Sequence, residues 1–110
     1  MKPNKGEIIA IIRGVQPDNM LEIVQTLRAE GIDWVEISLS EEEIGLECIR
    51  VIAEHFKDRV NLGAGTVINE KLVDKAIEAG AKYIITPGWD RELVRYIKRK
   101  GVEVFPGVFS

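Results

Sequence analysis

The sequence predicts an α/β fold in which four βα units and a fifth strand follow one another along 110 residues. Short runs rich in Ile and Val alternate with stretches whose apolar residues recur at helical spacing, with one βα unit in roughly 20–25 residues. Three of the helical stretches end in a glycine, followed within a few residues by the next apolar run: Gly31, Gly80 and Gly101. This order predicts parallel strands joined by right-handed helical crossovers.

The five expected strands are short and apolar. The sequence places them at residues 8–12, 34–39, 60–67, 82–86 and 102–105. The first is a continuous run of Ile and Ala, which is typical of a strand buried on both faces of a parallel sheet.

Helix-start signals precede the four helical stretches. Pro17 stands at the start of the first, and Asn69 and Asp90 are expected to cap the third and the fourth. Ser40, with Glu43 three residues later, predicts a capping box for the second.

Five parallel strands fit two architectures. One is an open doubly wound sheet, and the other is about half of an eight-stranded barrel. The open sheet usually carries a glycine-rich phosphate loop after its first strand, but residues 13–17 lack both common patterns of such loops. Polar residues and glycines instead follow every strand, which favours a ring of strand ends around one mouth. We therefore expect residues 1–110 to be a single α/β domain, with TIM-barrel-type βα repeats that form half of a (β/α)8 barrel.

Glu36 is the strongest candidate for a catalytic residue. It stands inside an apolar strand, where a carboxylate is costly to bury unless it is paired or hydrogen-bonded. Burial raises the pKa of a carboxyl and suits it to proton transfer near neutral pH. The alternative is a structural glutamate that pairs with Arg13 at the end of the neighbouring strand.

Three further residues are candidates for substrate binding. Thr66 follows two glycines at a strand end, where a ligand can approach closely, and its hydroxyl faces that opening. Thr66 and Thr86 could hold a carboxylate or carbonyl, although threonines at strand ends are often structural. Arg13 could bind an anion through its guanidinium fork or simply neutralise Glu36.

Composition excludes several classes of function. The net charge is −3 and the sequence pI is about 5.2, so there is no basic surface to bind nucleic acid or an anionic membrane. The single cysteine, Cys48, allows no internal disulfide, and neither it nor His55 belongs to a cluster of metal ligands. No signal-peptide or membrane-spanning stretch is visible. We expect a cytoplasmic protein without metal or cofactor.

Five segments at the strand ends, taken together, closely resemble the first half of the 2-keto-3-deoxy-6-phosphogluconate / 4-hydroxy-2-oxoglutarate (KDPG/KHG) aldolase family. They are residues 9–14 (IAIIRG), 35–39 (VEISL), 63–67 (GAGTV), 79–88 (AGAKYIITPG) and 106–108 (PGV). The resemblance covers nearly the whole chain.

The resemblance implies a (β/α)8 barrel and a class I, Schiff-base aldolase, usually trimeric. Such an enzyme splits a 2-keto-4-hydroxy acid into pyruvate and an aldehyde. It implies that Glu36 moves protons during carbinolamine dehydration and carbon–carbon cleavage, that Thr66 helps to hold the pyruvyl carboxylate, and that Pro87 lines the site. The expected partners are a small keto acid and further copies of the chain or a complementary half-barrel.

The sequence departs from the family pattern at two places. Ser40 stands where many members carry an arginine that binds a carboxylate. The Schiff-base lysine of the family lies on the sixth strand, and the phosphate site at later strand ends, beyond Ser110. Lysines in this chain are expected on exposed helix faces, in loops, at the chain start and, for Lys82, at the amino end of a strand. We therefore expect the chain to be inactive alone. The alternative is a non-catalytic half-barrel module that self-associates, or an open sheet that binds small anions.

Overall fold

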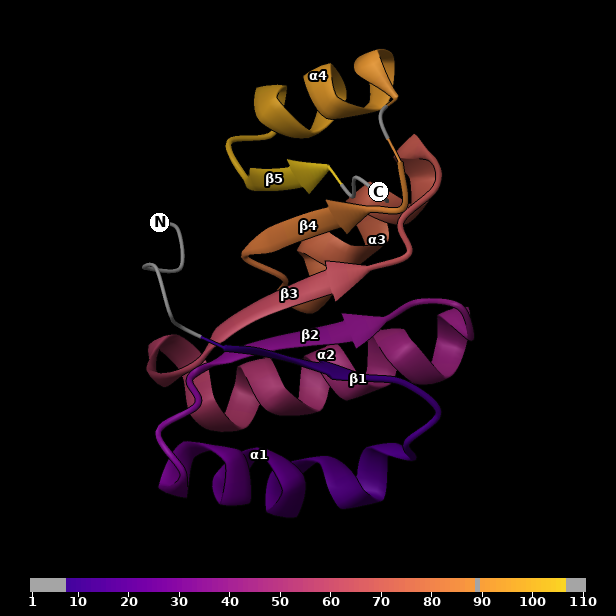
Figure 1. The fold of residues 1–110 in the computed structure, drawn as a ribbon. Helices are drawn as coiled ribbons and strands as arrows, with labels where there is room; N and C mark the ends of the chain where they lie inside the picture. The colour runs from indigo at the N-terminus through magenta and orange to yellow at the C-terminus, as the bar shows by residue number, and fades with distance from the viewer. Residues whose placement is uncertain (1–7, 89, 107–110) are drawn as a thin grey trace.

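The computed structural model describes residues 8–88 and 90–106 and confirms the α/β class (Figure 1). Five parallel strands form one sheet in the order β1-β2-β3-β4-β5, and in Figure 1 their arrows all point the same way. The strands are β1 (Ile9–Ile12), β2 (Trp34–Ser38), β3 (Asn61–Gly65), β4 (Tyr83–Thr86) and β5 (Glu103–Pro106). The strand order follows the chain order, as in a segment of a (β/α)8 barrel.

Four α-helices and two short 3-10 helices connect the strands. They are η1 (Pro17–Asn19), α1 (Met20–Ala29), α2 (Glu42–Phe56), η2 (Lys57–Arg59), α3 (Glu70–Ala79) and α4 (Arg91–Arg99). Right-handed crossovers between neighbouring strands place all the helices on one side of the sheet. None of the helices in the described ranges is long and apolar enough to cross a membrane.

The main core lies between the sheet and the helices. Alternate side chains of the strands point to this helix side and meet the apolar stripes of the helices. The fully buried members include Val35, Ile84, Val24, Ile49, Ile52, Val73 and Ile97. The remaining strand side chains point to the opposite surface, which we call the inner face. It carries Ile11, Trp34, Glu36, Ser38, Gly63, Gly65, Tyr83 and Phe105.

Two of the predicted helix caps are confirmed, and one is wrong. The Asn69 carboxamide oxygen accepts from the amide of Leu72 at 2.8 Å, and the Asp90 carboxylate accepts from the amide of Leu93 at 3.1 Å. Helix α2 has Glu41 as its N-cap residue and no side-chain cap, so the capping box expected at Ser40 does not form. Because α2 begins at Glu42, Ser40 stands one residue before the N-cap, and its hydroxyl accepts a hydrogen bond from Ser38.

The strands differ from expectation at two points. Strand β3 ends at Gly65 because Thr66 has a φ of 59°, which takes the backbone out of the extended region. The first strand is not buried on both faces, since Ile8 and Ile11 are 63% and 62% exposed. The physical reason is its position: among the described residues β1 pairs with β2 alone, so it is an edge strand of the sheet.

Candidate active site

Glu36 lies on the inner face, in the middle of β2. Its register partners are Ile11 on β1 and Gly63 on β3. The side chain is only 7% exposed and leans toward the carboxyl end of the sheet, where a Cβ built on Gly65 would overlap its carboxylate. Gly65 is therefore required for the carboxylate to occupy this position.

Burial dominates the electrostatics of this carboxyl. It raises the pKa of Glu36 above its ordinary value, and the positive charge of Arg13 offsets part of that rise. Within the described residues, Glu36 and Arg13 form no ion pair. The Arg13 charge therefore acts on the Glu36 carboxyl from a longer distance. The geometry thus disfavours the salt-bridge alternative and leaves a buried carboxyl whose neutral form is favoured relative to an exposed glutamate.

Three hydroxyl groups gather beside Glu36 at the carboxyl ends of β2 and β3. The Ser38 hydroxyl donates to the Ser40 hydroxyl at 3.1 Å, and the oxygens of Ser38 and Thr66 lie 3.2 Å apart. Thr66 reaches this position through its left-handed backbone, which is unfavourable for a β-branched residue. A strained residue held at a strand end is frequent at functional sites, and here it brings a hydroxyl into the cluster.

Arg13 lies at the same edge of the sheet. It lines a narrow pocket between the ends of β1 and β2 and the start of α2, together with Gly14, Ser38 and Ser40. Its own side chain is exposed. An anion approaching the hydroxyl cluster from solvent would therefore meet this guanidinium.

Thr86 and Pro87 lie at the end of β4 and line a shallow hollow with Val67 and Ile68. Strand alternation places Thr86 on the helix side, opposite to Tyr83 and Ile85. Its hydroxyl donates to the Gly88 carbonyl at 2.8 Å. The structure therefore brings Thr66 close to the hydroxyls near Glu36, but it gives Thr86 a local contact within its own turn.

The sequence analysis did not single out Tyr83, which is part of this surface. A Cβ on Gly63 would overlap its ring, and its hydroxyl donates to the Val35 carbonyl at 3.0 Å. The ring also packs against Trp34, with the centroids 5.4 Å apart. The available signal was a glycine paired with an aromatic residue on the neighbouring strand, which is visible only once the register of β3 and β4 is known.

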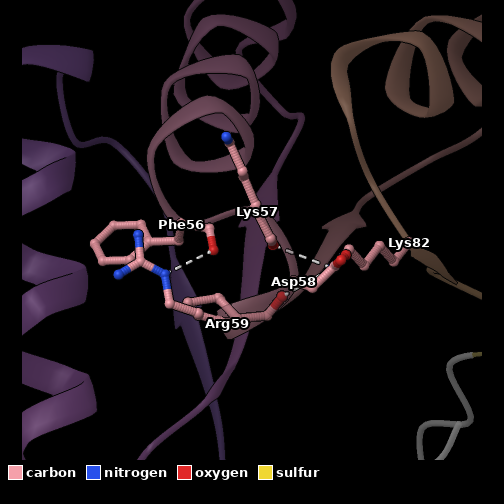
Figure 2. A network of polar contacts seen from close by, with 6 residues as sticks. Phe56, Lys57, Asp58, Arg59 and Lys82 are labelled. Atoms are coloured by element: carbon pink, nitrogen blue, oxygen red, sulfur yellow. Dashed lines mark hydrogen bonds and ion pairs between the residues drawn. The ribbon is translucent and has the colours of Figure 1, made fainter.

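No lysine occurs within the five strands as the structure bounds them. Lys82 precedes β4, and its amine donates to the Lys57 carbonyl at 3.1 Å and to Asp58 at 3.0 Å, both in η2 (Figure 2). Because η2 leads directly into β3, Lys82 lies at the amino ends of the strands, opposite the hydroxyl cluster. Lys75 and Lys100 form surface ion pairs with Glu42 and Asp74.

The donor chemistry of the described residues does not favour a metal centre. Within residues 8–88 and 90–106, no group of three or more His, Cys, Asp and Glu side chains is placed to hold an ion. Cys48 is a buried residue of α2, and its thiol donates to the Val15 carbonyl at 3.4 Å. Burial also raises the pKa of this thiol.

Fold and site together define a segment of a βα barrel that carries a buried carboxyl and hydroxyls at the carboxyl ends of its parallel strands. Comparison with known proteins makes this more specific. The model of the family "Aldolase: KDPG and KHG aldolase" matches residues 2–110, and the chain belongs to this family.

Individual relatives agree with this assignment. The 2-dehydro-3-deoxy-6-phosphogalactonate aldolase of Escherichia coli is 35% identical over 103 residues, which are 94% of this chain and 50% of the relative. The 2-dehydro-3-deoxy-phosphogluconate aldolase of Pseudomonas aeruginosa is 32% identical over 106 residues, 96% of this chain and 47% of the relative. The chain thus spans about half the length of these relatives.

Solved structures show the same correspondence. A structure described as native KDPGal superposes with a TM-score of 0.87 at 33% identity, over 99% of this chain and 52% of the other. The KDPG aldolase of Legionella pneumophila, with pyruvate captured as a covalent carbinolamine, has a TM-score of 0.84 at 29% identity, over 93% of this chain and 48% of the other. The five-stranded sheet therefore corresponds to about half of an aldolase of this family.

Proposed function

We propose that this chain supplies the proton-transfer half of the active site of a class I, Schiff-base aldolase. The proposed substrate is of the 2-keto-3-deoxy-6-phosphogluconate or 4-hydroxy-2-oxoglutarate type, cleaved to pyruvate and an aldehyde in carbohydrate metabolism in the cytoplasm. The observation that carries the proposal is the buried carboxyl of Glu36, held over Gly65 beside three hydroxyls. Membership of the family and the carbinolamine captured in the Legionella relative support it.

Glu36 would serve two proton transfers. Its neutral form, favoured by burial, gives a proton to the carbinolamine hydroxyl as the C–O bond breaks and water leaves. The resulting carboxylate then takes the proton of the C4 hydroxyl while the C3–C4 electron pair moves toward the iminium and the aldehyde departs. Each step returns the carboxyl to the state that the other step needs.

The remaining residues would orient the substrate. Thr66, with the neighbouring serine hydroxyls, can donate hydrogen bonds to the pyruvyl carboxylate, and Arg13 adds a positive charge at the same edge. Pro87 would line the far side of the pocket, and Thr86 would hold the adjoining turn through its bond to the Gly88 carbonyl. Ser40 provides a neutral hydroxyl where many family members have an arginine, so we expect weaker attraction for a carboxylate there.

The Schiff-base lysine would come from outside the described residues. The strands contain no lysine, and Lys82 is bound at their opposite end. We therefore propose that residues 1–110 form one domain that acts only within a completed barrel, with the lysine on a later strand.

Trapping with pyruvate and sodium borohydride tests this proposal. The 110-residue chain is expected to form no covalent adduct by mass spectrometry. A barrel completed with the second half of the Escherichia coli phosphogalactonate aldolase should form the adduct and cleave substrate. Glu36→Gln in that barrel should lower kcat by a factor on the order of 100 or more. An adduct on residues 1–110 alone would refute the placement of the lysine, and full activity of Glu36→Gln would refute the role of Glu36.

A specific observation also favours association with another half-barrel. The inner face is apolar along β1, where Ile11 is 62% exposed, and the outer edges of β1 and β5 pair with no strand among the described residues. One relative at 34% identity is a cage designed by fusing symmetric oligomeric domains. We propose that this face takes up a complementary half-barrel or a second copy. A monomer in light scattering at micromolar concentration, unchanged by Ile11→Asp, would contradict self-association.

A further inference from the structure

The two glycines of β3 accommodate side chains from the strands on either side. The ring of Tyr83 on β4 occupies the space over Gly63, and the carboxylate of Glu36 on β2 occupies the space over Gly65. A Cβ on Gly63 would overlap the Tyr83 ring, and a Cβ on Gly65 would overlap the Glu36 carboxylate. The Gly-Ala-Gly segment therefore lets an acid and a tyrosine ring lie next to each other on the inner face.

Tyr83 links β4 directly to β2. Gly63 is the register partner of both Glu36 and Tyr83, so the three residues form one row across the sheet. Because Gly63 has no side chain, the tyrosine can cross β3, and its hydroxyl donates to the Val35 carbonyl at 3.0 Å in a buried hydrogen bond. Val35 immediately precedes Glu36, so this bond fixes the backbone at the point where the carboxyl is attached.

Aromatic packing holds the tyrosine ring in place. Trp34 lies on one side, with centroids 5.4 Å apart and planes at 52°, and Phe105 on the other, at 5.6 Å and 67°. Tyr83 is only 1% exposed, and Trp34 is 4% exposed. Together these rings exclude water from the amino-terminal side of Glu36.

We propose that Tyr83 is a positioning residue of this site, which holds β2 at Glu36 through Val35 and shields the carboxyl from water on its amino-terminal side. The proposal rests on the proposed role of Glu36 as the proton carrier. Two other charged residues lie near this row. Arg13 directly follows β1 in the chain, and Glu103 is the register partner of Tyr83 on β5. Neither occupies the space between Tyr83 and Glu36.

Titration of the Glu36 carboxyl by carbon-13 NMR in the 110-residue chain tests the proposal without substrate. In Tyr83→Leu, water reaches the carboxyl, and we expect its pKa to shift downward toward that of an exposed glutamate. Tyr83→Phe keeps the ring and loses only the bond to Val35, so its shift should be smaller and in the same direction. The expected order of the Glu36 pKa is wild type, then Tyr83→Phe, then Tyr83→Leu.

Ile84→Ala is the matched control. Ile84 is the next residue of β4, is fully buried and points to the helix side. Its loss should destabilise the fold without moving the titration of Glu36. The proposal is overturned if the tyrosine variants leave the Glu36 pKa unchanged, or if Ile84→Ala shifts it equally. Should Tyr83→Leu not fold, the comparison of wild type with Tyr83→Phe decides the matter by the same criterion.

The two proposals fail separately. If Tyr83 variants do not alter the Glu36 titration, positioning by Tyr83 is refuted whether or not a completed barrel cleaves substrate. If Glu36→Gln leaves a completed barrel fully active, the catalytic role of Glu36 is refuted, whereas the influence of Tyr83 on its titration still stands as measured.

Discussion

The helix side and the inner face of the sheet are built from alternate residues of the same strands, yet their chemistry differs. The helix side is aliphatic and joins the core beneath the helices. The inner face carries a glutamate, a serine, two glycines and three aromatic rings: Glu36, Ser38, Gly63, Gly65, Trp34, Tyr83 and Phe105. Trp34 and Tyr83 are buried, but they lie outside the cluster that forms the main core.

The difference shows which face supports the fold and which supports the chemistry. Helix-side positions need apolar volume, which several residue types provide. Inner-face positions need a specific neighbour: Glu36 needs the bare Cα of Gly65, and Tyr83 needs that of Gly63. Mutations on the helix side should therefore act through lost apolar volume, and mutations on the inner face through the specific neighbour that they disturb.

The largest difference is expected between two isoleucines. Ile84→Ala removes a fully buried side chain from the helix side and should lower the free energy of unfolding by about 3 kcal/mol. Ile11→Ala, on the inner face of the edge strand, removes a side chain that is 62% exposed and should change it by less than about 0.5 kcal/mol. Urea unfolding of the 110-residue chain, at a concentration where it is monomeric, measures both. Equal losses would contradict the division between the faces.

A glycine on the inner face should be less tolerant than its size suggests. Gly63→Ala places a methyl group against the Tyr83 ring and should destabilise the chain by about 2 kcal/mol. Gly88→Ala is the control, because a Cβ there meets nothing within 4 Å and the φ is not left-handed. In a Tyr83→Leu background the cost of Gly63→Ala should shrink, since the ring is gone. An undiminished cost in the double variant would show that the ring is not the cause.

Much of the fold could be predicted from the sequence, because each element carries a local signal. The apolar runs predicted the positions of the five strands, and the predicted caps at Asn69 and Asp90 are confirmed. The Ser40 cap was wrong because α2 begins at Glu42, which makes Glu41 the N-cap residue, and helix boundaries are only loosely set by local sequence. Burial of the first strand was overestimated because edge position depends on the whole sheet.

The candidate site was predictable only in part. Glu36 stood out because a charge inside an apolar run is costly, whatever surrounds it. Tyr83 did not, because an aromatic residue at the start of a strand is ordinary, and its role depends on crossing Gly63 to reach Val35. The left-handed Thr66 was equally hidden, because nothing in its local sequence requires that backbone.

That backbone offers a third test, with a smaller effect. Thr66→Asn loses the hydroxyl near Ser38 but relieves the left-handed backbone, which asparagine tolerates better than threonine, so its free energy of unfolding should be about 1 kcal/mol higher than that of Thr66→Val. Thr66→Val retains the branched shape and loses the hydroxyl near Ser38, so it should lose about 1 kcal/mol relative to wild type. Thermal unfolding of the two variants measures this difference. Equal destabilisation by both would mean that the backbone of Thr66 stores no strain.

The finest distinction between the faces concerns pH. Burial raises the folded-state pKa of Glu36 above its ordinary value of 4.5, so at pH values between these two the folded chain binds more protons than the unfolded chain. Stability contributed by this group is therefore fully present below pH 4.5 and falls as the pH rises through the raised pKa. Glu36→Gln cannot ionise and should escape this loss.

Relative to wild type, Glu36→Gln should therefore gain stability as the pH rises from 4.5 through the raised pKa, and the gain should stay constant above it. Urea unfolding across that range measures the difference. Glu54→Gln, on the exposed side of α2, controls for the removal of a negative charge alone. If the difference between Glu36→Gln and wild type does not grow with pH, the carboxyl is not held in its neutral form by burial. The inner face would then lack the feature that separates it most clearly from the helix side.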